Sequence, residues 1–84
     1  MVTELAIRDF AFAPKDFSVP IGTTVTATNY DGATHDWTSR TAMFGSGDLQ
    51  TNQAYSFTFR SAGRFDFLCT IHPSMTGTVT VIPS

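Results

Sequence analysis

Hydrophobic and polar residues alternate with a period of two along most of the chain. The clearest runs are 55–60, 64–69 and 78–81, in which aromatic or aliphatic residues take every second position. Such a run predicts a half-buried strand with one face in the core. No stretch of a dozen residues keeps a helical period free of Gly and Pro, so we expect little or no helix.

Turn-forming Gly, Pro and Asp residues divide the chain into seven predicted strands. These strands are 3–8, 16–20, 23–30, 35–40, 54–60, 64–69 and 77–82. Many short strands with frequent turns predict an antiparallel sandwich or barrel. Neither a repeat nor a linker interrupts the pattern, and we therefore expect residues 1–84 to form a single domain.

The alternation changes phase near the N-terminus. Leu5 and Ile7 fall in one phase, whereas Phe10 and Phe12 fall in the other. A strand cannot bury both pairs on one face without an extra residue or a reversal. The sequence therefore predicts a turn or a bulge near Asp9.

Composition excludes several classes of function. The formal net charge is −2 and the five basic residues are scattered, so there is no basic run for a nucleic acid backbone. No apolar run reaches membrane-spanning length, so we expect no membrane insertion of this segment. A single Cys rules out an internal disulfide.

The chemistry of the chain is concentrated in four residues. His35 lies in the first half, and Cys69, His72 and Met75 follow one another at intervals of three. A thiolate, two imidazoles and a thioether are the ligands of a blue-copper electron-transfer site. They use every Cys and His of the chain, which leaves no spare imidazole for acid–base catalysis. We therefore expect one copper ion that passes electrons, and no enzyme activity.

Longer segments carry a resemblance to a known family. The chain resembles the cupredoxins, small blue-copper proteins such as amicyanin, plastocyanin and pseudoazurin. The matching segments are 12–14, 19–25, 29–35 and 63–79. The resemblance implies an all-β, Greek-key β-sandwich (cupredoxin-like) of about seven to eight strands. It also implies a type 1 copper site with His35, Cys69 and His72 as strong ligands and Met75 as the weak axial ligand.

Two positions depart from the family pattern. Asp36 stands where the family usually has Asn, and Ile71 stands where Pro is common. We expect the Asp36 carboxylate to accept hydrogen bonds from Thr70, as the Asn would tie the two ligand segments together. Unlike Asn, an ionised Asp cannot donate, and it adds negative charge near the metal.

The resemblance also suggests how the protein meets its partners. In the family, the His of the ligand loop reaches the surface within an apolar patch, and we expect a redox donor and acceptor to dock transiently there, near His72. Candidates for the patch are Phe12, Pro14, Met43, Phe44 and Pro73. The resemblance further suggests a monomer in the periplasm or at the cell surface, with a signal or an anchor outside this segment.

Several alternatives remain at this point. The chain could be a copper-binding module for delivery or storage, the electron-input domain of a larger copper oxidase or reductase, or a metal-free structural module. Zinc also accepts His and Cys ligands. Met43 is a second thioether that could reach the metal, although packing is its simpler role. For Trp37 a core position is favoured over a place beside the copper.

Overall fold

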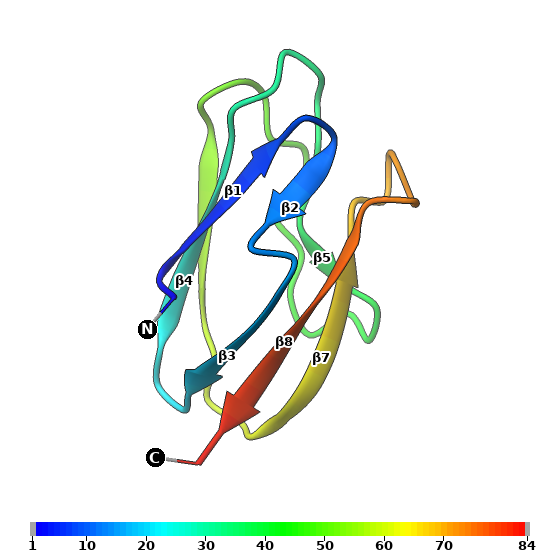
Figure 1. Cartoon of the computed structure of the whole chain (residues 1–84). Coiled ribbons are helices and arrows are strands. Elements are labelled where there is room, and N and C mark those ends of the chain that lie inside the picture. The colour runs from blue at the N-terminus through cyan, green and yellow to red at the C-terminus, as the bar shows by residue number, and fades with distance from the viewer. Residues whose placement is uncertain (1, 84) are drawn as a thin grey trace.

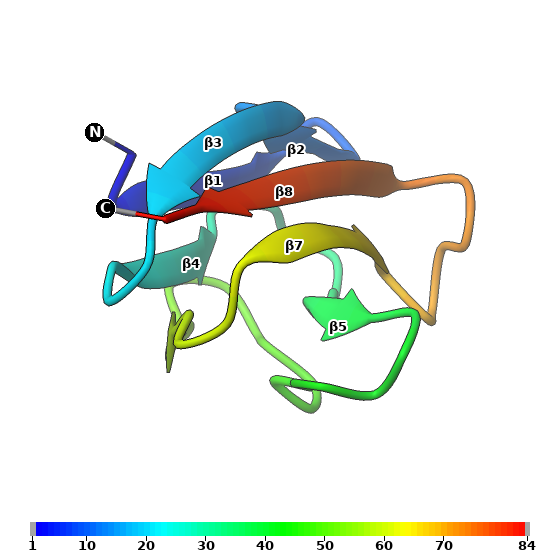
Figure 2. The ribbon, with the colours of Figure 1, turned by 90° about the horizontal axis from the view of Figure 1, so that it is seen from below.

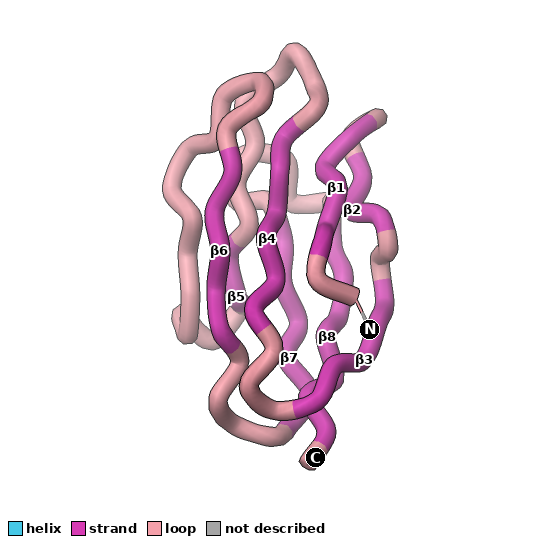
Figure 3. The backbone as a smooth tube through the Cα atoms, turned by 90° about the vertical axis from the view of Figure 1, so that its left-hand side faces the viewer, coloured by secondary structure: helices cyan, strands magenta, loops and turns pink. Residues whose placement is uncertain are grey.

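The protein folds as a sandwich of two four-stranded sheets. The computed structural model describes residues 2–83 (Figure 1). In chain order the strands are β1 (Glu4–Arg8), β2 (Ala11–Ala13), β3 (Asp16–Pro20), β4 (Thr24–Asn29), β5 (Thr38–Ser39), β6 (Ala54–Thr58), β7 (Gly63–Leu68) and β8 (Thr76–Ile82). One sheet has the order β2-β1-β4-β6 and the other β3-β8-β7-β5. Figures 2 and 3 show the two layers, and the all-β sandwich prediction is confirmed.

The strand pairing corrects part of the sequence prediction. Both sheets are mixed, because β1 pairs in parallel with β4 and β3 in parallel with β8. The expectation of a purely antiparallel sandwich is therefore wrong. The chain passes to the opposite sheet between each pair of parallel neighbours, and a parallel pair needs such a crossover. Alternation gives the same signal for either direction, so the sequence pattern does not distinguish them.

Most strand boundaries lie within two residues of prediction, and two regions differ more. The short strand β2 forms a hairpin with β1, although the sequence predicted only a turn or bulge there. The predicted strand 35–40 shrinks to the two residues of β5, and His35 instead makes an isolated bridge to Leu49. Both differences reflect tertiary pairing, which local alternation does not report. No apolar helix of membrane-spanning length occurs within residues 2–83.

The turn between β1 and β2 consists of two residues in the left-handed region. Asp9 has φ 53° and Phe10 has φ 55°, which is the backbone pattern of a type I′ hairpin. Neither residue is glycine, so the turn is strained unless other contacts support it. The change of phase predicted near Asp9 is thus confirmed as a tight reversal.

The core lies between the sheets and is rich in aromatic rings. Trp37 is fully buried at its centre, and its ring centroid lies 4.5 Å from that of Phe44 and 5.9 Å from that of Phe67. Its indole Nε1 is buried without a hydrogen-bond partner among the described residues. The core position expected for Trp37 is therefore confirmed, and its surroundings are apolar.

Gly77 permits the close contact between β8 and its neighbours. A Cβ at this position would lie 2.4 Å from the carbonyl oxygen of Lys15 and 2.5 Å from the ring of Phe67. The first of these atoms is backbone, so it cannot move aside cheaply. The site requires glycine because there is no room for a side chain.

We predict that Gly77→Ala lowers the free energy of unfolding by about 1–3 kcal/mol, the usual cost of overpacking. Urea unfolding of the metal-free protein, followed by Trp37 fluorescence, measures the change. Gly32→Ala is the matched control, because a Cβ there meets nothing within 4 Å. Equal effects of the two substitutions would contradict the steric explanation.

Candidate metal centre

Three loops meet at one end of the sandwich, in the upper part of Figure 1: the β1–β2 turn, the segment between β4 and β5, and the loop between β7 and β8. The second of these loops carries His35, and the third carries Cys69, His72 and Met75. Cys69 directly follows β7 and is fully buried, in phase with the buried Phe67. The alternation along β7 therefore aims the sulfur into the protein, as the sequence predicted.

The β7–β8 loop is closed by its own backbone hydrogen bonds. The amide of Met75 donates to the carbonyl of His72 at 2.9 Å, and the amide of Cys69 donates to the carbonyl of Met75 at 3.0 Å. These bonds hold three of the predicted ligand residues on one short loop. Met75 is buried on this loop, with only 3% of its surface exposed.

His35 lies in the segment between β4 and β5 and reaches the same end of the sandwich. Its backbone exchanges two hydrogen bonds with Leu49, at 3.1 and 2.7 Å, and its side chain is fully buried. A histidine buried in an apolar core must have polar partners for both ring nitrogens. One ring nitrogen, Nε2, lies 2.8 Å from Oδ2 of Asp31. The other nitrogen, Nδ1, points toward Cys69.

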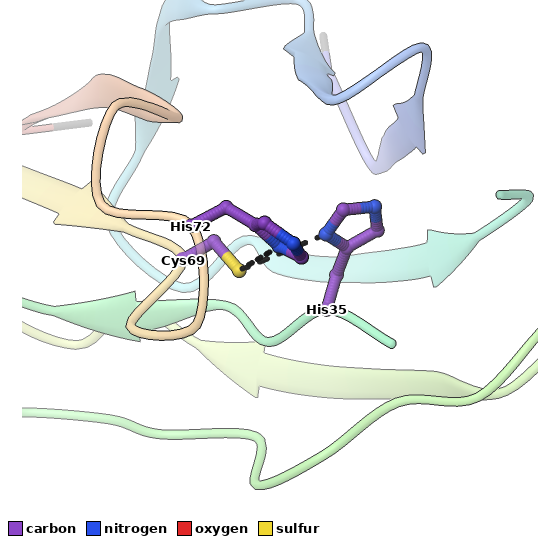
Figure 4. Close-up of side chains that lie close together, drawn as sticks. All are labelled: His35, Cys69 and His72. Atoms are coloured by element: carbon purple, nitrogen blue, oxygen red, sulfur yellow. Dashed lines mark hydrogen bonds between the residues drawn. The ribbon is translucent and has the colours of Figure 1, made fainter. Parts of the chain in front are cut away.

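The three side chains form a triangle of ligand atoms (Figure 4). The sulfur of Cys69 lies 3.7 Å from Nδ1 of His35 and 3.8 Å from Nδ1 of His72, and all three atoms are within 4.8 Å of one another. Two ligands about 2.3 and 2.0–2.1 Å from one metal ion, and 120° apart, are separated by about 3.8 Å; these lengths are those of zinc–sulfur and zinc–nitrogen bonds. The spacing therefore fits a trigonal metal site.

The donor set decides which metal suits the triangle. A soft thiolate with two imidazoles favours copper among the first-row metals, and a weak fourth ligand such as a thioether is typical of electron-transfer sites. The amide of Asp36 also donates to the Cys69 sulfur at 3.4 Å. Hydrogen bonds to a ligating sulfur tune the potential of the metal. The residues present therefore fit a copper ion.

Asp36 ties the two ligand segments together. Its carboxylate accepts hydrogen bonds from the amide of Thr70, at 3.0 and 3.2 Å, and from the Thr70 hydroxyl. The hydroxyl of Thr38 donates to it at 2.8 Å. The expected contact between Asp36 and Thr70 is confirmed. With only 3% of its surface exposed, this carboxylate sits beside the metal centre and depends on these donors.

Asp31 supports the opposite side of His35. Its carboxylate accepts from the His35 ring and from the backbone amides of Asp9 and Phe10. Burial raises the pKa of Asp31, but the hydrogen bonds from Phe10, Asp9 and His35 outweigh burial, so this pKa lies below its usual value. The carboxylate is thus held as an anion next to a ligand imidazole.

The surface near His72 differs from the predicted patch. Phe12 and Phe44 are buried core residues, with 3% and 5% of their surfaces exposed, so their assignment to the patch is wrong. The family resemblance implies an apolar patch but does not distinguish apolar residues of the surface from those of the core, and both side chains belong to the buried core cluster. Pro14, Met43 and Pro73 are exposed.

Phe10 is the site residue that the sequence reasoning missed. Its ring centroid lies 5.0 Å from that of His35 and 4.9 Å from that of His72, edge-on to both. It remains 53% exposed. The signal was present in the change of phase near Asp9, which placed Phe10 in a turn, but only the fold brings that turn to the metal end.

Comparison with known proteins agrees with this geometry. The sequence model described as copper binding proteins of the plastocyanin/azurin family matches residues 1–82. Amicyanin-alpha of Methylorubrum extorquens is 32% identical over 84 residues, covering 94% of this chain and 71% of that protein. Amicyanin of Paracoccus denitrificans is 34% identical over 80 residues, covering 89% of this chain and 61% of that protein. A copper-containing nitrite reductase from Thermus scotoductus superposes with a TM-score of 0.91 at 26% identity, over 100% of this chain and 23% of that one.

We predict that Asp36→Asn raises the reduction potential of the copper-loaded protein. The carboxylate places negative charge beside the metal, which favours the more positive Cu(II) state, and Asn removes that charge while keeping an acceptor for Thr70. A redox titration followed by visible absorption measures the shift. Glu4→Gln is the control. It removes an exposed charge at the start of β1, the end of that strand farther from the metal centre, and should shift the potential much less. No rise for Asp36→Asn relative to this control would refute the electrostatic argument.

Proposed function

The chain belongs to the plastocyanin/azurin family of copper-binding proteins, and from this premise we propose that it carries single electrons between redox proteins through one type 1 copper. The observation that carries the proposal is the triangle of His35, Cys69 and His72. Copper, when bound, supplies a one-electron Cu(II)/Cu(I) couple. The family and this donor set together make the protein a blue-copper electron carrier.

We assign Nδ1 of His35, Sγ of Cys69 and Nδ1 of His72 as the strong ligands, and the thioether of Met75 as the weak axial ligand. The buried position of Met75 on the closed ligand loop supports this assignment. Met43 is a poor rival, because 39% of its surface is exposed. These ligands come from hydrogen-bonded segments, so we expect their positions to stay nearly constant when the charge of the site changes. A small change in geometry keeps electron transfer fast.

Electrons would enter and leave through His72. Its side chain is half-buried, and its neighbours in the chain, Ile71 and Pro73, are exposed. The Phe10 ring lies edge-on to the imidazole and Ile71 is 43% exposed, so we propose that Phe10, Ile71 and Pro73 form a small apolar surface around His72. Weak redox encounters bury little surface, and a small apolar patch suits brief docking of a donor and then an acceptor.

The same reasoning supports the remaining features of the proposal. A site saturated by protein ligands offers no position for a substrate, so we propose a carrier and not an enzyme. We place the carrier in the periplasm or another extracytoplasmic compartment, where members of this family mostly work. Residues 1–84 would act as a single domain and as a monomer.

A second candidate is an electron-input domain of a larger copper enzyme. The match to a copper-containing nitrite reductase favours it. All of this chain superposes on that enzyme, but it covers only 23% of the enzyme's length. In that case the partner of His72 would be a second metal centre in the same polypeptide. The length of the natural polypeptide distinguishes the two candidates.

We predict that the metal-free protein binds one equivalent of Cu(II) and turns intensely coloured. The absorption arises from the Cys69 thiolate, and electron spin resonance should show the narrow copper hyperfine splitting of a type 1 site. Cys69→Ser should lose the visible band, because it removes the thiolate. Metal analysis before loading excludes prior occupation by zinc. A weak band with ordinary splitting would leave only surface copper and would overturn the proposal.

We also predict that Ile71→Glu slows electron self-exchange at least tenfold without changing the visible spectrum. Two copies must bring their His72 edges together, and a carboxylate on each patch repels the other. Broadening of proton resonances in a mixture of oxidised and reduced protein gives the rate. Ile21→Glu is the matched control, since Ile21 is 37% exposed in the β3–β4 turn. Equal rates for the two variants would remove Ile71 from the docking surface.

A further inference from the structure

One carboxylate joins a ligand imidazole to the hairpin turn that covers the metal centre. Oδ2 of Asp31 lies 2.8 Å from Nε2 of His35 and accepts from the amide of Phe10 at 3.0 Å. Oδ1 accepts from the amide of Asp9 at 2.7 Å. Asp31 belongs to the segment between β4 and β5, so three donors from two separate segments converge on a single side chain.

The turn depends on this carboxylate. Asp9 and Phe10 both occupy the left-handed region, which is unfavourable for residues other than glycine. Their amides point in the same direction and form a small concave donor pair, a favourable receptor for an anion. The anion that binds these two amides is the carboxylate of Asp31. Two hydrogen bonds hold the backbone of Asp31 in place. Its amide donates to Oδ1 of Asn29 at 2.8 Å, and its carbonyl accepts from the Thr51 hydroxyl at 2.6 Å.

The turn in its strained form places Phe10 against both ligand imidazoles. The phenyl ring meets His35 at an interplanar angle of 88° and His72 at 86°, while the two imidazoles lie 4.9 Å apart. Edge-to-face contacts of this kind favour defined ring orientations. A ring that is 53% exposed gains little from burial at this place. Its position is instead dictated by the backbone of the turn.

We propose that Asp31 and Phe10 are positioning residues that orient both imidazoles before the metal binds. Asp31 accepts a hydrogen bond from the Nε2–H of His35, which leaves the Nδ1 lone pair facing Cys69. Because the same carboxylate binds the amides of the Asp9–Phe10 turn, it also keeps the phenyl ring packed against His35 and His72. The proposal rests on the ligand assignment of the proposed function, and it adds that the ligand triangle exists in the metal-free protein because these two residues maintain it.

The first test uses the imidazole N–H of His35 in the metal-free protein. In the native protein its proton should give a resolved NMR signal protected from exchange with water, because it is buried and bonded to a carboxylate. Asp31→Ala should accelerate this exchange at least tenfold, and Cu(I) binding, measured by competition with a chromogenic chelator, should weaken about 10–100-fold, the usual cost of losing a partner of a ligating His. Asp31→Asn, which keeps one acceptor oxygen, should fall between. Unchanged exchange and affinity in Asp31→Ala would overturn the proposal.

Asp9→Asn is the matched control for charge. It removes one negative charge from the same turn but keeps the Asp9 amide that Asp31 binds. It should leave the His35 signal and the Cu(I) affinity within about twofold of native. A loss as large as that of Asp31→Ala would mean that net charge, and not positioning, explains the effect.

Phe10→Ala tests the packing of the phenyl ring separately. It also replaces Asp31→Ala as the test if that variant does not fold. Removing the ring should expose the His35 N–H to solvent and accelerate its exchange, whereas Phe10→Leu, which keeps apolar bulk, should do so less. Native-like exchange in Phe10→Ala would overturn the role of the ring. All these exchange measurements use protein without metal, so they remain valid even if copper loading shows the ligand assignment to be wrong.

Discussion

The structure depends on the close approach of Cys69 and His35. These residues are 34 positions apart in the chain, yet Sγ and Nδ1 lie 3.7 Å from each other at one end of the sandwich. Asp36 secures this approach, because it follows His35 and binds Thr70, the residue after Cys69. The ligand segments of the two sheets are therefore joined by side-chain and backbone hydrogen bonds as well as by the core beneath them.

Two carboxylates flank His35, and each satisfies donors that would otherwise be strained or unpaired. Asp31 accepts from the imidazole and from the hairpin turn, while Asp36 accepts from Thr70 and Thr38. Removing a carboxylate from water is costly unless charge-assisted hydrogen bonds replace the lost hydration. Here the replacement donors all belong to segments that carry ligands or cover them. Each carboxylate thus contributes to the geometry of the site and also to its negative electrostatic environment.

This arrangement explains how a small domain can hold a metal and exchange electrons. Asp31 binds the His35 ring and the Asp36 amide binds the Cys69 sulfur, and the apolar core contains Trp37 and Phe67 in edge contact. Of His35, Cys69 and His72, only His72 is partly exposed; the Phe10 ring lies edge-on to it, and its chain neighbours Ile71 and Pro73 are exposed. The surface of the protein at the metal centre therefore includes the imidazole of His72 but not the side chains of His35 and Cys69.

The sequence by itself determined the all-β class, the phase that buries Cys69, the reversal near Asp9 and the complete set of thiolate and imidazole donors. These follow from local alternation and from the scarcity of Cys and His. Only the tertiary structure decided the parallel pairings β1–β4 and β3–β8, the reduction of 35–40 to β5, and the burial of Phe12 and Phe44. It also decided that Phe10 and Asp31 meet at the ligands. Alternation reports which face of a strand is buried, but it carries no information on which strand lies beside it or which turn lies above it.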